Sequence, residues 1–207
     1  MMQIAFNDVS KRFGQTRILS GFSFEFKSGT AYHIAGPNGS GKSTFLKLVC
    51  AFLTPDKGQI RFTSAGKVLE PEQMAEHTAF CAPYIDLLDE LTGREQLDFH
   101  QSFKPLLKGS DMLAEVKAAG LYEALDKPIR LYSSGMRQRL KLILTFLSDS
   151  NLLLLDEPCS NLDESGRQFY ASLAQHYTAG RLVMVASNNM PEEHFFCTER
   201  VEPSLVL

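Results

Sequence analysis

The stretch GPNGSGKST, residues 36–44, decides the fold that this sequence predicts. Residues 36–43 match the pattern G-x-x-x-x-G-K-[ST] in full. They follow TAYHIAG (30–36), an apolar run that predicts a buried strand, and they lead into KSTFLKLVCAFL (42–53), which predicts an amphipathic helix. A strand, a glycine-rich loop and a helix in this order indicate a P-loop. The alternative, a glycine-rich turn with a chance lysine, does not explain the complete motif.

The loop residues have distinct expected roles in binding phosphate. Glycines let backbone N–H groups approach phosphate oxygens, and the helix start adds the positive end of its dipole. Lys42 would reach the β- and γ-phosphates of a nucleotide, and Ser43 would coordinate Mg²⁺. The predicted nucleotide site comprises Gly36, Pro37, Asn38, Gly39, Ser40, Gly41, Lys42, Ser43 and Thr44.

A pair of acids closes the apolar run NLLLLDEP, residues 151–158. A continuous apolar run is typical of a central parallel strand, so Asp156 should lie at the carboxyl edge of the sheet, where such folds bind ligands. We assign Asp156 to the Mg²⁺ shell. Glu157 would orient and deprotonate an attacking water, which typically accelerates a reaction by about 10²–10⁴-fold. The alternative for Glu157 is a cap on the following loop.

Strand and helix patterns occur on both sides of a largely helical middle, residues 93–148. The further expected strands are QIAFNDV (3–9), FSFEFK (22–27), GQIRFTS (58–64) and RLVMVASN (181–188), and residues 164–177 form an expected helix. The predicted fold class is α/β: a P-loop NTPase core with a mainly parallel sheet and an N-terminal antiparallel β region. We predict one domain over residues 1–207, with a helical subdomain inserted at about 85–148.

Composition narrows the possible partners and compartment. The chain has 207 residues and a formal net charge of -3, which argues against general nucleic-acid binding. It has no run of eighteen apolar residues and no signal-peptide pattern, so we expect a cytosolic protein. The four cysteines are widely spaced, so we interpret them as ordinary thiols rather than metal ligands.

A second candidate anion site lies in RLYSSGMRQRLKLILTF, residues 130–146. Ser133, Ser134 and Gly135 precede a helix that carries a basic run at residues 137–141. Small hydroxyl residues and a glycine before a basic helix suit an anion. The alternatives are a serine-rich helix cap and, for the basic run, a solvated helix face.

Together these segments resemble the nucleotide-binding subunit of an ATP-binding cassette (ABC) transporter, over nearly the whole chain. YSSGM (132–136) is similar to the family signature, LLLLDEP (152–158) closes with the acidic pair, and Ser160–Asp163 resembles the D-loop. The short, single-cassette length is like that of the heme-exporter ATPases of cytochrome c maturation.

The resemblance implies ATP and Mg²⁺ as ligands, and two cassettes that associate head to tail around two ATP molecules. Phe13 would stack on adenine, although a strand-edge Phe is more often part of a core. The implied contacts to the ATP of the second cassette are Ser133, Ser134, Gly135, Met136 and Asp163. ATP-driven closure would move a transmembrane subunit, which would hold this chain at the cytoplasmic face.

Three motifs depart from the family pattern. The signature has Ser134 and Met136 where the family usually has glycine and glutamine. The Q-loop glutamine falls near Pro83 or Tyr84, and Tyr84 has a hydroxyl to offer. The switch histidine falls on Asn188, which forms hydrogen bonds but does not titrate near neutral pH. We expect these changes to affect the rate of hydrolysis rather than ATP binding.

The sequence is compatible with four functions, of which we favour the first. It is an ATPase subunit that powers a separate membrane-embedded transporter, as a homodimer or a heterodimer, with residues 80–106 as the expected docking face. The second is a slow or non-hydrolysing, nucleotide-gated regulatory module. An ABC protein acting on DNA or ribosomes and a P-loop small-molecule kinase fit the motifs less well. The substrate and direction of transport do not follow from the sequence.

Overall fold

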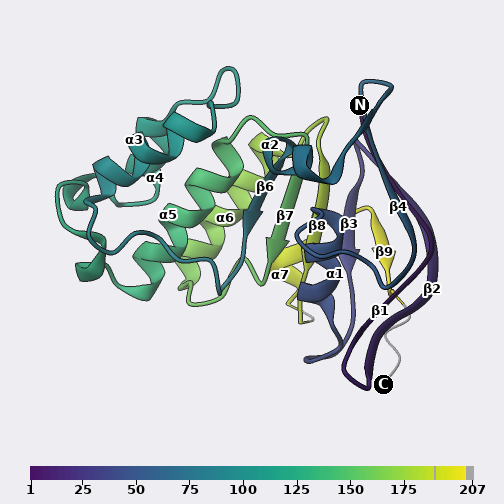
Figure 1. The fold of residues 1–207 in the computed structure, drawn as a ribbon. Helices are drawn as coiled ribbons and strands as arrows, with labels where there is room; N and C mark the ends of the chain where they lie inside the picture. The colour runs from purple at the N-terminus through teal and green to yellow at the C-terminus, as the bar shows by residue number, and fades with distance from the viewer. Residues whose placement is uncertain (189, 204–207) are drawn as a thin grey trace.

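The computed structural model describes residues 1–188 and 190–203, which form two sheets and a set of helices (Figure 1). One sheet is parallel, in the order β6-β7-β8-β3-β9. Its strands are β6 (Thr78–Cys81), β7 (Leu152–Asp156), β8 (Leu182–Ala186), β3 (Ala31–Ile34) and β9 (Glu199–Val201). β7 and β8 are buried along their whole length, which explains their continuous apolar sequence.

The second sheet is antiparallel, in the order β2-β1-β4-β5. Its strands are β1 (Met2–Phe13), β2 (Thr16–Lys27), β4 (Lys57–Ser64) and β5 (Lys67–Leu69). A tight turn with Gly14 at φ 57° joins β1 to β2. β1 and β2 are longer than predicted. Register shifts between Phe6 and Arg12 interrupt the alternation of apolar and polar residues, so the sequence pattern covers only part of each strand. The predicted α/β class, with an N-terminal antiparallel region, is confirmed.

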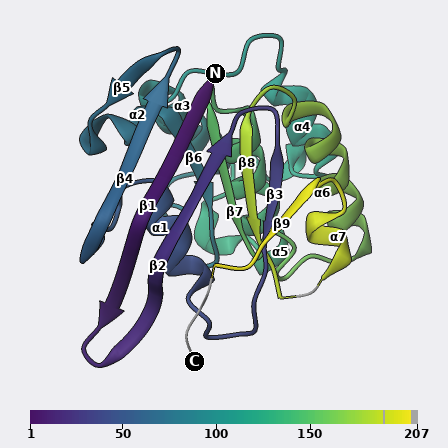
Figure 2. The ribbon, with the colours of Figure 1, turned by 90° about the vertical axis from the view of Figure 1, so that its right-hand side faces the viewer.

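Helix α1 (Lys42–Val49) follows the phosphate loop and lies between the two sheets (Figure 2). Phe45 stacks on Phe6 of β1, with ring centroids 5.2 Å apart, so the helix start is fixed to the antiparallel sheet. The helix ends earlier than predicted because Ala51 adopts a left-handed conformation, at φ 59°. This packing holds the amino end of α1 at the carboxyl edge of the parallel sheet.

The remaining helices cover the other face of the parallel sheet and extend away from it (Figure 1). They are α3 (Gly93–Phe103), α4 (Met112–Ala118), α5 (Ser134–Leu147) and α6 (Glu164–Tyr177). The short elements are α2 (Met74–His77), α7 (Pro191–His194), η1 (Pro71–Gln73), η2 (Tyr122–Ala124) and η3 (Ile129–Leu131). α4 ends before the helical pattern in its sequence does, because the backbone of Gly120 adopts a left-handed conformation, at φ 68°. The subdomain boundary at about 85–148 remains a prediction.

Two further features bear on the expected compartment and on the cysteines. Within residues 1–188 and 190–203, every helix is too short or too polar to cross a membrane. The four cysteines are free thiols, and Cys81 and Cys159 are buried next to the acidic pair that ends β7.

Candidate nucleotide-binding site

Four loops meet at the carboxyl edge of the parallel sheet. They follow the neighbouring strands β6, β7, β8 and β3. With Asp156 at the end of β7, they bring together Tyr84, Glu157, Asn188 and the phosphate loop. The sequence did not reveal β6, because its four residues, TAFC, are too short for a recognisable pattern. This strand places Tyr84 beside the acids.

The phosphate loop wraps closely around the side chain of Lys42. Gly39 and Gly41 adopt positive φ angles of 76° and 94°, which favour glycine. Lys42 Nζ donates to the carbonyl oxygens of Gly36 (2.8 Å) and Pro37 (3.0 Å) and to Asn188 Oδ1 (2.6 Å). Burial lowers the pKa of Lys42, while the carboxylates of the acidic pair oppose this shift. All three ammonium protons are used within the chain, so a phosphate would replace at least one acceptor.

A cavity of about 460 Å³ opens in front of this loop. Its lining consists of Ile18, Asn38, Gly39, Ser40, Gly41, Lys42, Ser43, Thr44, Asp156, Glu157 and Asn188. Seven of the nine predicted loop residues therefore face one space with both acids and Asn188. Ile18 was missed because a β-branched residue in a strand carries no functional signal.

Asp156 is suited to hold a metal ion with Ser43. The carboxyl group is 2% exposed, and burial raises its pKa, although the hydroxyls of Ser43 and Tyr84 act in the opposite direction. Its Oδ2 has no hydrogen-bond partner in the described part of the chain, and neither has the buried hydroxyl of Ser40. A buried carboxylate oxygen without a partner is costly, so these residues fit Mg²⁺ and a phosphate as ligands.

Asn188 connects the acidic pair to the phosphate loop. Its Nδ2 donates to Glu157 Oε1, and its Oδ1 accepts from Lys42. Glu157 adopts a left-handed conformation at φ 46°, and its N–H donates to Ala186 O of β8 (2.9 Å). The side chain at the switch position thus links the expected base to the lysine without carrying charge.

Tyr84 is the Q-loop candidate whose side chain reaches the metal site. Burial and the neighbouring Asp156 carboxylate raise the pKa of Tyr84, and the Tyr84 hydroxyl opposes the rise in the pKa of Asp156. Lys47 Nζ lies 4.1 Å from the centre of its ring, and Phe80 packs edge-on at 6.2 Å between centroids. Pro83 is exposed.

Phe13 lies at the end of β1 and is 50% exposed. The Nζ of Lys11 lies 5.6 Å from the centre of its ring. Phe13 is not part of the cavity lining, so the structure does not bring it together with the phosphate loop. Adenine stacking on Phe13 stays a prediction.

The YSSGM segment serves as the start of α5 and contacts the D-loop of its own chain. Ser133 Oγ accepts the N–H of Met136 at 3.2 Å, so the serine is a helix cap. A Cβ on Gly135 would lie 3.2 Å from Asn161 O, which explains why a small residue stands there. Asp163 accepts the N–H of Gly166 (2.8 Å) and caps α6.

The basic run on α5 is a partly solvated face whose cations also contact neighbouring loops of the same chain. Arg137 pairs with Asp89 (2.6 Å), and Arg139 pairs with Asp163 (2.5 Å). Lys141 Nζ donates to Ala82 O, at 3.1 Å, in the loop that leads to Tyr84. The three cations are partly buried and fix the loops around the helix.

Gln138 of the same helix is a supporting residue that the sequence did not reveal. It is 2% exposed, and its Nε2 donates to Pro158 O at 2.7 Å, directly after the acidic pair. One glutamine between two arginines gives no sequence signal, so only the fold shows this contact.

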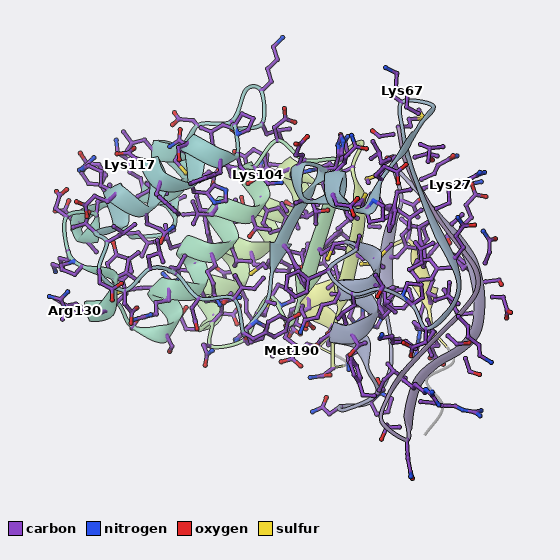
Figure 3. The ribbon with its side chains drawn as sticks, in the orientation of Figure 1. Lys27, Lys67, Lys104, Lys117, Arg130 and Met190 are labelled. Atoms are coloured by element: carbon purple, nitrogen blue, oxygen red, sulfur yellow. The ribbon has the colours of Figure 1, made fainter. Side chains whose placement is uncertain are left out.

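The two candidate phosphate sites are separate within one chain. None of the described residues that line the cavity comes from 133–136. Figure 3 shows Arg130, three residues before Ser133, at the far end of the helical region, whereas Met190 lies below the parallel sheet. Each site therefore needs its own explanation.

Comparison with known proteins gives a consistent assignment. A model of the family described as "ABC transporter" matches residues 19–160. The chain is 30% identical over 196 residues to the daunorubicin resistance ATP-binding protein DrrA3 of Streptomyces coeruleorubidus, covering 91% of this chain. It is 31% identical over 199 residues to the Nod factor export ATP-binding protein I of Burkholderia lata, covering 94% of this chain. It spans only 61% and 65% of the length of these two relatives.

Solved structures show the same fold. One described as the ATP-binding subunit of an ABC transporter superimposes with a TM-score of 0.83, at 23% identity, covering 97% of this chain and 85% of that chain. Another, an ATP-binding protein from Pyrococcus furiosus, gives a TM-score of 0.80 at 21% identity, covering 97% of both chains.

Proposed function

This chain belongs to the ABC transporter family, and we propose that it is the ATP-binding and ATP-hydrolysing subunit of a transporter whose membrane-embedded part is a separate protein. The observation that carries the proposal is the convergence of Lys42, Asp156, Glu157 and Asn188 on one cavity beside the phosphate loop. When bound, Mg²⁺ would neutralise negative charge on the phosphates of ATP. Ser43 and Asp156 are the residues that would hold it.

Asn188 stands where the family has its switch histidine, and it would position Glu157 as that histidine is expected to do. A phosphate that binds Lys42 would replace the Oδ1 of Asn188, the one acceptor of the three that belongs to a side chain and is exposed. Asn188 then retains its bond to Glu157, which stays aimed at the γ-phosphate as a base for water. Since an amide does not titrate near neutral pH, this arrangement holds Glu157 without a proton exchange at Asn188.

Tyr84 takes over the Q-loop role through its hydroxyl. The support is that the hydroxyl lies near enough to Asp156 to oppose the rise in the pKa of that carboxyl, and that the Tyr84 ring contacts Lys47 on the phosphate-loop helix. A hydroxyl that orients a metal ligand commonly matters about 10–100-fold for metal affinity or activity.

The test of hydrolysis is Glu157→Gln, with the exposed Glu90→Gln as control. We expect phosphate release from Mg-ATP to fall about 10²–10⁴-fold in the first variant and to stay at the wild-type rate in the control. ATP affinity should be preserved, because the amide has the size of the carboxylate. Equal turnover in the wild type and Glu157→Gln would exclude Glu157 as the base.

A second function, a slow or non-hydrolysing regulatory module, is favoured by the replacements at Tyr84 and Asn188. It shares the ATP site and differs in turnover. Tight ATP binding without phosphate release, even in the presence of a copurifying membrane partner, would support the module and contradict the enzyme.

We extend the proposal to a head-to-tail pair of cassettes. In such a pair Ser133, Ser134, Gly135, Met136 and Asp163 of one chain would contact the ATP held by the other. The support is that the YSSGM segment and the phosphate loop are separate within one chain. ATP should shift Glu157→Gln from monomer to dimer in size-exclusion chromatography. Monomer alone, with and without ATP, for this chain and with its partners, would contradict the pair.

Residues 80–106 are the proposed docking face for the membrane subunit. Ile85, Leu88, Phe99 and Phe103 are exposed apolar side chains in this range, and Phe103 is 73% exposed. A surface with several exposed apolar residues commonly marks an interaction site. The test is whether a membrane protein copurifies with the wild type and no longer does so with Phe99→Ser or Phe103→Ser. Loss of copurification with ATP binding retained would support this docking face. Retained copurification would place the docking face elsewhere.

A further inference from the structure

The short helix α7 carries a buried carboxylate that contacts the loop after the acidic pair. Glu193 is 2% exposed, and no described cation forms an ion pair with it. A buried carboxylate without a cation is unfavourable for stability, because desolvation opposes its charge. An apolar residue at this position would fill the same space without the cost of desolvating a charge.

Glu193 and its helix contact the two loops that carry Glu157 and Asn188. The Oε1 of Glu193 accepts the N–H of Cys159 at 2.9 Å, two residues after Glu157. The hydroxyl of Ser187, directly before Asn188, accepts the N–H of Met190 at 3.3 Å, where α7 begins, and it opposes the rise that burial causes in the pKa of Glu193. Glu193 and its helix thus contact the segments that follow the ends of the two neighbouring strands β7 and β8.

α7 itself is attached to the fold by other groups. The hydroxyl of Tyr170 donates to the backbone oxygen of Glu193 at 2.5 Å. The ring of His194 stacks on His33 of β3, with centroids 3.8 Å apart and planes 7° apart. These contacts do not involve the Glu193 carboxylate, so they hold the helix in place when that side chain is changed.

We propose that Glu193 is a positioning residue that fixes the loop of Glu157 relative to the loop of Asn188. Glu157 needs such support because its left-handed backbone, at φ 46°, is unfavourable for a residue with a Cβ. Without the acceptor at Cys159, the loop after Glu157 loses a buried hydrogen bond and the Glu157–Asn188 contact loosens. The inference rests on the proposed hydrolytic function.

The experiment compares Glu193→Ala and Glu193→Gln with Glu192→Gln, the exposed neighbour on the same helix. Amide hydrogen exchange of residues 157–160 and 187–188 reports on the loops without any need for turnover. Turnover and KM for ATP report on the consequence. Far-UV circular dichroism and thermal unfolding check that each variant is folded.

We expect Glu193→Ala to raise exchange in both loops and to lower kcat about 10–100-fold, with KM within about three-fold of the wild type. Glu193→Gln keeps an oxygen for the Cys159 N–H and should recover part of both losses. Glu192→Gln should match the wild type. A role in stability alone would lower the melting temperature and leave kcat unchanged.

The outcomes separate this inference from the proposed function. Wild-type exchange in both loops of a folded Glu193→Ala variant overturns the inference, whatever the turnover. A wild type without turnover overturns hydrolysis as the function, whereas the exchange data still decide whether Glu193 holds the loops. Raised exchange with an unchanged kcat contradicts positioning as a requirement for catalysis.

Discussion

Ser40 and Ser133 are serines in glycine-containing segments at the start of a helix, yet their surroundings differ. The hydroxyl of Ser40 is buried without a hydrogen-bond partner in the described chain. The hydroxyl of Ser133 is exposed and accepts the N–H of Met136. The same contrast extends to the cations, because Lys42 faces a cavity whereas Arg137 and Arg139 pair with acids of their own chain.

The contrast teaches that similar residues serve different purposes at the two sites. Around the phosphate loop, the buried Ser40 hydroxyl and Asp156 Oδ2 lack hydrogen-bond partners in the described chain, which is unfavourable until a ligand supplies them. In the YSSGM segment, the polar groups stabilise the fold, so any contact with a second chain is an additional use. Mutations in the first region should therefore affect ligand affinity, and mutations in the second should affect stability.

The largest expected effect is that of Lys42→Ala on nucleotide affinity. We expect a loss of about 100-fold or more, because charge-assisted hydrogen bonds to phosphate are each worth about 1.5–3 kcal/mol. Titration with a fluorescent ATP analogue measures it, with the exposed Lys67→Ala as control. Affinity equal to that of Lys67→Ala would break the comparison, since the phosphate loop would then not be the binding site.

The next effect is that of Asn188→Leu, which removes both of its hydrogen bonds at constant size. Turnover should fall about 10-fold, because Glu157 loses its hydrogen-bonded orientation, while ATP affinity changes by less than about three-fold. Steady-state phosphate release and the same titration measure the two quantities. Unchanged turnover would show that Glu157 is positioned by its backbone and the neighbouring loops alone.

A matched pair, Ser133→Ala and Ser40→Ala, tests the contrast directly. Ser133→Ala should lower the free energy of unfolding by about 1 kcal/mol, because it removes a helix cap. Ser40→Ala should leave the stability of the nucleotide-free protein equal or slightly higher, because the buried hydroxyl has no partner to lose. Urea denaturation without nucleotide measures both. A larger loss of stability in Ser40→Ala would reverse the comparison.

The smallest effect is expected for the Arg137–Asp89 pair, which lies near the surface. A double-mutant cycle with Arg137→Ala and Asp89→Ala should give a coupling free energy of about 0.2–1 kcal/mol, since water and salt screen such pairs. Denaturation at low and high salt measures it, and the coupling should shrink at high salt. A coupling above this range would show that the basic run contributes more to the fold than we infer.

Local patterns were sufficient to predict the phosphate loop and the acidic pair. Each pattern reflects a requirement within a few consecutive residues: glycines for the close approach of the backbone, and an apolar run for a strand buried on both faces. The helix at residues 164–177 was predicted with its observed bounds because Asp163 caps it and its apolar face is regular. The same local reasoning overextended the helix at 42–53, since the conformation of Ala51 has no local signal.

The sequence by itself determined that this chain is an α/β P-loop protein, and it predicted a nucleotide site with an acidic pair beside it. Only the tertiary structure decided how the site is assembled. It placed Tyr84 beside Asp156, set Asn188 between Lys42 and Glu157, and used the basic run of α5 to hold loops. The physical reason is that these contacts join strands that are neighbours in the sheet and distant in the chain, so sequence spacing carries no record of them.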